Sequence, residues 1–189
     1  MKRLKDKIAI VTGASSGIGR ATAKLFVEEG AAVVVTARRQ PELDALVAEI
    51  VKTGGKAIAV AGDVKDEAHA KALVDTAVNQ FGGLDVAFNN AGFVGDIKPI
   101  LELSLAKWRE VLDTNLTGAF LGAKHQVLAM IKRGGGSLIF TSSFVGYTVG
   151  MPGMVAYAAS KAGQIGLVKG LAGTGFRGRP PRPQAHGPA

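Results

Sequence analysis

The sequence predicts a doubly wound α/β fold, in which helices cover both faces of a parallel sheet. Short β-branched runs alternate with helical patterns, the strands are apolar throughout, and a glycine-rich segment follows the first strand. With 189 residues, 47% of them hydrophobic, the chain fits one domain, which we place at residues 1–172. The predicted strands are 7–12, 31–36, 56–61, 84–88 and 137–141.

The segments between these strands carry apolar residues at helical spacing. Gly30 follows the first helix as a stop signal, and Pro41 suits the first turn of the second. A third stripe covers residues 70–81, Ser104 can cap a long fourth helix, and a last helix begins near residue 155. In the first helix four residues are predicted to share one apolar face: Ile18, Ala21, Leu25 and Phe26.

The composition excludes several classes of protein. The absence of cysteine excludes a disulfide framework, a thiolate metal site and a cysteine nucleophile. No stretch reaches the roughly 18 apolar residues of a membrane span, and the first apolar run is too short for a signal peptide. We therefore expect a soluble cytoplasmic protein. His69, His125 and His186 lack metal-binding spacing, so no metal site is expected and the histidines are predicted to lie on helix surfaces or in the tail.

The net charge of +8 raises the question of a nucleic-acid partner. Basic residues occur singly or in pairs without interleaved aromatics, as on solvated helix faces, so no nucleic-acid or membrane partner is predicted. Residues 172–189 differ from the rest, with four Pro, four Gly and three Arg. Such a composition predicts a disordered tail over residues 173–189.

The glycine-rich segment Gly13-x-x-x-Gly17-x-Gly19 lies where the first strand turns into a helix. Glycines there let the backbone approach a pyrophosphate, whose charge the free N–H groups of the helix start attract. A plain tight turn is the alternative. The second strand ends at Arg38-Arg39 without the carboxylate that would receive a ribose hydroxyl. A guanidinium suits a 2′-phosphate and favours NADP over NAD, unless both arginines are ordinary surface charges.

Tyr157 and Lys161 stand four residues apart and so share a helical face. A phenol has a reference pKa of about 10, and a nearby ammonium lowers it by stabilising the phenolate. This pair suits proton transfer near neutral pH, although Tyr-x-x-x-Lys is also common as an exposed pair.

Taken together and in this order, these motifs resemble the short-chain dehydrogenase/reductase family. The resemblance runs from about residue 5 to residue 171 and also includes Asn-Asn-Ala-Gly at 89–92, Asn115 and Ser143. It implies a Rossmann fold that lacks the last strands of the family, since nothing after residue 172 matches. We interpret this break as a truncation, by a shift of reading frame, that leaves the fifth strand as an exposed edge.

The resemblance also implies roles. Tyr157 would be the general acid, Lys161 would lower its pKa and hold the nicotinamide ribose, and Asn115 would help to hold a relay water near Lys161. Ser143 would bind the substrate oxygen, with Ser142 as the competing candidate. For Asp63 and Asn89 hydrogen bonding at strand ends is an equal alternative to cofactor contact. The cofactor-binding residues implied are Gly13, Ser15, Ser16, Gly17, Ile18, Gly19, Arg38, Asp63, Val64, Asn89, Ala91, Gly92, Tyr157 and Lys161.

The expected function is therefore an NADP-dependent oxidoreductase that interconverts a secondary alcohol and a ketone, similar to 3-oxoacyl-thioester reductases. A catalytically inactive fragment that binds dinucleotide, or pairs with a full-length relative, is the alternative. The resemblance further implies a small carbonyl or alcohol substrate and a homo-oligomer formed through the long helices.

Overall fold

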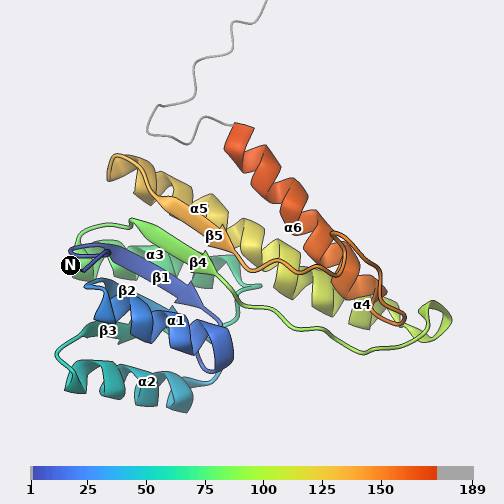
Figure 1. Cartoon of the computed structure of the whole chain (residues 1–189), viewed down its shortest axis with the longest axis horizontal. Helices are drawn as coiled ribbons and strands as arrows, with labels where there is room; N and C mark the ends of the chain where they lie inside the picture. Colours follow the sequence, from blue (N-terminus) through green and yellow to red (C-terminus); the bar gives the residue numbers. More distant parts are fainter. Residues whose placement is uncertain (1, 174–189) are drawn as a thin grey trace, which may run out of the picture.

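Five parallel strands form a single sheet with the strand order β3-β2-β1-β4-β5 (Figure 1). The computed structural model describes residues 2–173 of the chain. Ile10 at the centre pairs with Val34 on one side and Ala87 on the other. The chain reverses its direction of travel across the sheet between β1 and β4, where ligands bind in such folds. The strands are β1 (Ile8–Thr12), β2 (Ala32–Thr36), β3 (Lys56–Ala59), β4 (Val86–Asn89) and β5 (Ser137–Phe140).

Helices cover both faces of the sheet, which confirms the predicted doubly wound fold (Figure 1). Helices α1 (Gly17–Glu28) and α2 (Gln40–Lys52) pack on one face, against Ala9 and Val11 of β1. Helices α3 (Glu67–Phe81) and α5 (Gly118–Lys132) pack on the other, against Ile8 and Ile10. Successive residues of β1 thus face opposite cores, which explains why the strand is apolar without alternation.

The long helix predicted after Ser104 is three consecutive helical segments. Helix α4 (Leu105–Leu112) runs into the π-helical segment η2 (Asp113–Thr117), which continues as α5. A short 3₁₀ turn, η1 (Ile100–Glu102), precedes α4, and Ser104 caps α4 as predicted by accepting a hydrogen bond from the Lys107 N–H. Helix α6 (Val155–Gly173) packs against α4 and η2.

Two predictions about single side chains are wrong. Ile18 and Leu25 do not face the core, with 64% and 48% of their surface exposed, because the buried face of α1 consists of Gly19, Ala23 and Val27. His69 does not lie on the surface of its helix.

The His69 side chain is only 8% exposed and lies 2.8 Å from Thr36 Oγ1. It packs against Gly62, where a side chain would collide with the ring. The missing side chain at Gly62 and the hydroxyl partner together make burial of this imidazole possible.

In the described part of the chain β5 has a neighbouring strand on one side only, and its side chains alternate between exposed and half-buried. Ile139 is 40% exposed. The predicted tail at 173–189 lies outside the described residues, apart from Gly173 at the end of α6. Over residues 2–173 we find no helix with the length and apolar character needed to cross a membrane.

Candidate active site at the carboxyl ends of the strands

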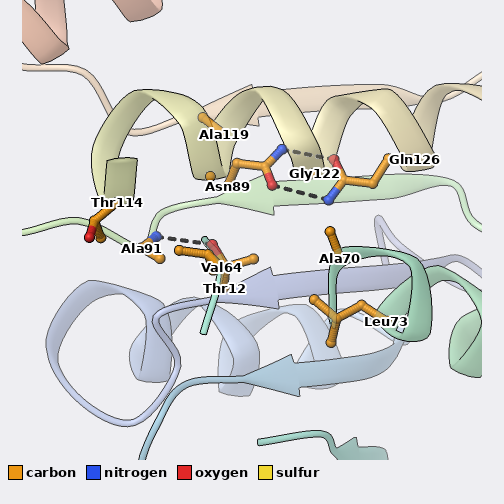
Figure 2. Close-up of a pocket in the computed structure, with 11 residues that line it drawn as sticks. Thr12, Val64, Ala70, Leu73, Asn89, Ala91, Thr114, Ala119, Gly122 and Gln126 are labelled. Carbon is orange, nitrogen blue, oxygen red and sulfur yellow. Dashed lines mark hydrogen bonds between the residues drawn. The ribbon is translucent and has the colours of Figure 1, made fainter. Parts of the chain in front are cut away.

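The loops after β1 and β4 are locked together at the carboxyl edge of the sheet. Thr12 Oγ1 accepts hydrogen bonds of 2.9 Å from the main-chain N–H groups of Asn90 and Ala91 (Figure 2 shows the Ala91 contact). Gly13 has a φ of +69°, and a Cβ there would lie 3.0 Å from the Ala91 Cα. Gly19 packs so closely on the Gly13 carbonyl that a side chain would collide with it. The glycines therefore serve close backbone approach.

The start of α1 offers unpaired donors to an anion. Ser16 at the N-cap makes no side-chain cap, and the first turn contains no acidic residue. Ser16, Gly17 and Ile18 are exposed here. The first N–H groups of the helix are free, and glycines leave room for a ligand to approach them. Both features suit a pyrophosphate, so this loop could hold the phosphates of a dinucleotide.

The two arginines after β2 have different surroundings. Arg39 donates a hydrogen bond of 3.1 Å to Ser15 Oγ in the glycine-rich loop and pairs with Glu42 at 2.8 Å. Arg38 is exposed and forms no ion pair with an acidic side chain of residues 2–173. One guanidinium is thus tied to the loop, and the neighbouring one is available to a ligand.

Asn89 is turned away from the edge and into the layer between β4 and α5. Its amide forms a reciprocal pair with that of Gln126, through hydrogen bonds of 2.9 and 3.0 Å, and both side chains are at most 5% exposed (Figure 2). The pair borders a cavity of about 20 Å³, room for about one water, which Thr12 and Val64 also line. The side chain of Asn89 therefore joins strand β4 to helix α5.

The loop after β3 carries Asp63 and Val64. The Asp63 carboxylate accepts a hydrogen bond from the Lys65 N–H at 3.1 Å and faces the Lys65 ammonium at 3.5 Å. The Val64 side chain packs on Gly118 at the start of α5. Asp63 therefore stabilises its own loop, and contact of either residue with an adenine stays a prediction.

Asn115 lies in η2 and is completely buried. Its Oδ1 accepts a hydrogen bond from the Phe93 N–H at 3.0 Å, and its Nδ2 donates to the Phe93 carbonyl at 2.9 Å and to Ser160 Oγ at 3.0 Å. The side chain thus joins the loop after β4, next to Gly92, to helix α6. Three hydrogen bonds of its amide serve this structural role.

Lys161 and Tyr157 are neighbours on helix α6. Lys161 is 3% exposed, its Nζ donates to the Thr141 carbonyl at 2.5 Å, and the same Nζ lies 5.7 Å from the centre of the Tyr157 ring. Burial lowers the pKa of Lys161 from 10.5 to about 8. The structure thus places a buried ammonium over the ring of Tyr157.

Ser143 lies in the loop between β5 and α6. Its Oγ accepts a hydrogen bond from the Val145 N–H at 3.1 Å, and the residue is half-buried, whereas Ser142 is exposed. Gly146, with a φ of +86°, brings this loop against the Ala158 carbonyl in the first turn of α6. The loop that carries Ser143 therefore packs on the first turn of α6, at the residue that follows Tyr157.

Two polar residues of this region escaped the sequence reasoning. The Gln164 side chain is 1% exposed and contacts Lys161 Nζ at 3.2 Å, and Gln126 pairs with Asn89. A glutamine three positions after Lys161, in a helix of mostly small and apolar residues, is a signal that was present in the sequence. The partner of Gln126 lies 37 residues away and becomes visible only in the fold.

Comparisons with known proteins identify the relatives of this chain. The short chain dehydrogenase family model matches residues 7–175. The chain is 39% identical over 170 residues to cyclohexanol dehydrogenase from Acinetobacter sp. (strain SE19), with 90% of this chain and 67% of the relative covered. It is 46% identical over 173 residues to tropinone reductase-like 1 from Erythroxylum coca, with 90% and 62% covered.

A 3-oxoacyl-[acyl-carrier-protein] reductase from Synechocystis sp. is 42% identical over 173 residues, with 91% and 69% covered. The crystal structure of a 3-ketoacyl-ACP reductase from Sinorhizobium meliloti 1021 superposes with a TM-score of 0.85 at 40% identity, covering 87% of this chain and 65% of that one.

The chain belongs to the short-chain dehydrogenase/reductase family, a family of oxidoreductases that use NAD(P). It spans 62% to 69% of the length of the three relatives described.

Proposed function

We propose that this chain is an NADP-dependent oxidoreductase that interconverts a secondary alcohol and a ketone. The observation that carries the proposal is the buried Lys161 ammonium beside the Tyr157 ring, with the loop of Ser143 packed on the same helix. With a nicotinamide dinucleotide bound, hydride transfer to a carbonyl carbon is the chemistry that the cofactor supplies. The protein must then supply a proton to the carbonyl oxygen.

Tyr157 is the proton donor in this proposal. Its Oη hands a proton to the carbonyl oxygen as negative charge develops there, and Lys161 stabilises the phenolate that remains. In the direction of alcohol oxidation, the phenolate takes the hydroxyl proton. Ser143 donates a hydrogen bond to the same substrate oxygen and so orients it. Asn115 acts at a distance, because it holds the loop at Gly92 and the first turns of α6 together.

The proposed cofactor site follows the carboxyl edge of the sheet. The glycine-rich loop at 13–19 would hold the pyrophosphate, Arg38 the 2′-phosphate, Asp63 and Val64 the adenine, and Ala91 and Gly92 the nicotinamide half. Lys161 would also bind the nicotinamide ribose. Two observations support this assignment. The backbone packs closely at Gly13 and Gly19, where no side chain stands in the way of a ligand, and the first N–H groups of α1 have no side-chain cap.

The relatives suggest the substrate class. They are named a cyclohexanol dehydrogenase, a tropinone reductase-like protein and a 3-oxoacyl-[acyl-carrier-protein] reductase. Phe144 and Met151, 63% and 46% exposed, belong to the loop that carries Ser143. These exposed apolar side chains near Ser143 suit an apolar carbonyl compound, such as a 3-oxoacyl thioester. A cytoplasmic location stays part of the proposal and can be checked by cell fractionation.

The decisive experiment compares wild type with Tyr157→Phe in the purified 189-residue chain. We expect NADPH to bind both proteins with equal affinity in a fluorescence titration. We expect wild type alone to reduce a screen of apolar ketones and 3-oxoacyl thioesters. Turnover by Tyr157→Phe at the wild-type rate would refute the role given to the phenol.

A catalytically inactive protein that still binds dinucleotide is the second candidate function. The observation that favours it is that, within residues 2–173, β5 has a neighbouring strand on one side only and Ile139 is 40% exposed. The same experiment separates the two. Tight NADPH binding without turnover of any carbonyl compound would favour the second candidate.

A further inference from the structure

A buried amide lies between Lys161 and the main chain of η2. Gln164 is 1% exposed; its Oε1 accepts a hydrogen bond from Lys161 Nζ at 3.2 Å, and its Nε2 donates to the Asn115 carbonyl at 2.6 Å. The side chain therefore joins the ammonium of the proposed site to the π-helical segment.

Both η2 and α6 have a feature that favours this contact. In a π-helical turn the hydrogen bonds follow an i→i+5 pattern, so the α-helical pairing of carbonyls is interrupted there and a carbonyl becomes available to a side chain. Gly163 lets α6 approach closely, since a Cβ at this position would lie 2.6 Å from Leu116 Cδ2. At this short spacing the amide of Gln164 reaches the Asn115 carbonyl directly.

The contact also fixes the donors of Lys161. An ammonium group has three N–H donors in tetrahedral directions. Within residues 2–173 two of them are taken, by the Thr141 carbonyl and by Gln164 Oε1. The third N–H remains for a ligand, and its direction is set by the other two. Gly92 lies close to this ammonium, since a Cβ there would be in van der Waals contact with Nζ at 3.6 Å.

We propose that Gln164 is a positioning residue for Lys161, whose amide fills the space between Nζ and the Asn115 carbonyl and leaves one N–H of the ammonium for a hydroxyl of a bound ligand. This inference rests on the proposed function, which gives Lys161 its role. A relay water near Asn115 and Lys161 is what the family resemblance implies; here a side-chain amide joins the two groups.

The test measures the titration of Lys161 itself in the full chain, without cofactor or substrate. The ¹³Cε signal of Lys161, assigned with Lys161→Arg, is followed by NMR from neutral to alkaline pH. In Gln164→Leu the ammonium loses an acceptor, so its pKa should fall by about one unit. In Gln164→Glu a carboxylate replaces the amide beside the ammonium, so its pKa should rise by about one unit.

Gln126→Leu is the matched control, because it removes a buried amide that pairs with Asn89 and does not contact Lys161. We expect it to leave the Lys161 titration unchanged. An unchanged titration in both Gln164 variants, or an equal shift in Gln126→Leu, would overturn the proposal. If Gln164→Leu does not fold, Gln164→Glu decides alone, and the absence of a rise refutes the inference.

Turnover provides a second readout. In an active chain, the pH profile of kcat should move with the Lys161 titration in each variant, whereas a purely structural effect would lower kcat equally at every pH. A wild-type chain without turnover would count against the proposed function but would leave the titration readable. Failure of the proposed function and failure of this inference are therefore distinguishable.

Discussion

Lys161 combines a charge with burial, and this combination has a cost in stability that depends on pH. The folded-state pKa of about 8 lies below the usual lysine value of 10.5 because burial disfavours the ammonium. Between these pH values the unfolded chain binds the extra proton, so the free energy of unfolding rises with pH. Relative to Lys161→Met, wild type should gain up to about 3 kcal/mol across this window.

Urea unfolding of both proteins at a series of alkaline pH values measures this difference. The other titrating groups are common to the two chains and cancel in the comparison. A stability difference between wild type and Lys161→Met that stays constant from neutral to alkaline pH would show that the buried ammonium has an ordinary pKa.

His69 should make the fold sensitive to mild acid. Burial lowers the pKa of this imidazole below 6.5, although the charges of Asp66 and Asp63 oppose the shift. In mild acid the unfolded chain therefore binds a proton at His69 more readily than the folded chain does. Stability is therefore lost as the pH falls below about 6.5 toward the folded-state pKa. In His69→Gln, which keeps a polar group near Thr36, the slope of unfolding free energy against pH should be smaller. Equal slopes in the two proteins would contradict the prediction.

The selectivity between nucleotides is expected to depend on Arg38. This guanidinium is exposed and free of acidic partners in the described chain, so it can pair with a 2′-phosphate. Arg38→Ala should weaken NADPH binding about tenfold and leave NADH binding unchanged. Arg39→Ala is the neighbouring control: through Ser15 it should affect both nucleotides alike. Equal affinities of wild type for NADPH and NADH would refute the preference for NADP.

At the scale of the elements, the turn that carries Ser143 depends on one glycine. Gly146 has a φ of +86°, and a Cβ there would collide with the main chain of Ala158. Gly146→Ala should therefore cost about 2 kcal/mol of stability through backbone strain and separate the loop from α6. Gly150→Ala in the same loop meets no atom within 4 Å and serves as the control. Thermal unfolding of both variants checks this, and equal melting temperatures would show that the turn is not strained.

The elements show what the sequence could predict. Strands and helices of the first half are local patterns of apolar residues and glycines, and the structure places them within a few residues of the prediction. The π-helical segment was not predicted, because it continues the same apolar stripe and differs only in hydrogen-bond register. The exposure of Ile18 was missed for a related reason: the small residues Gly19 and Ala23, and not the large ones, face the strand.

Some contacts of the candidate site can likewise be predicted from local spacing, and others depend on the fold. Tyr157 and Lys161 are neighbours along one helix, so their spacing alone predicts their contact, which the structure records as 5.7 Å between Nζ and the ring centre. The amide pair of Asn89 with Gln126 and the hydrogen bond from the Gln164 amide to the Asn115 main-chain carbonyl join residues far apart in sequence. No local pattern encodes such partners, since they depend on how the sheet places α5 and α6.

At the scale of the whole molecule, α4 and α5 expose large apolar side chains that a monomer would leave in water. Leu105 on α4 is 60% exposed, and Phe120 and Leu128 on α5 are 48% and 58% exposed. Phe120 and Leu128 stand eight positions apart, which places them on one face of α5. We expect this face to pair with the same face of a second copy, since an interface between identical chains is the commonest way to cover such a surface.

Substitutions on that face should break the association. Phe120→Glu and Leu128→Glu place charges in the expected interface, where burial without a partner is costly, and should each convert an oligomer to a monomer. Val51→Glu is the control, because Val51 is 56% exposed on α2, a different helix. Light scattering coupled to size exclusion gives the molar mass of each protein. A monomeric wild type, or a loss of association in Val51→Glu as well, would show that this face of α5 is not the contact.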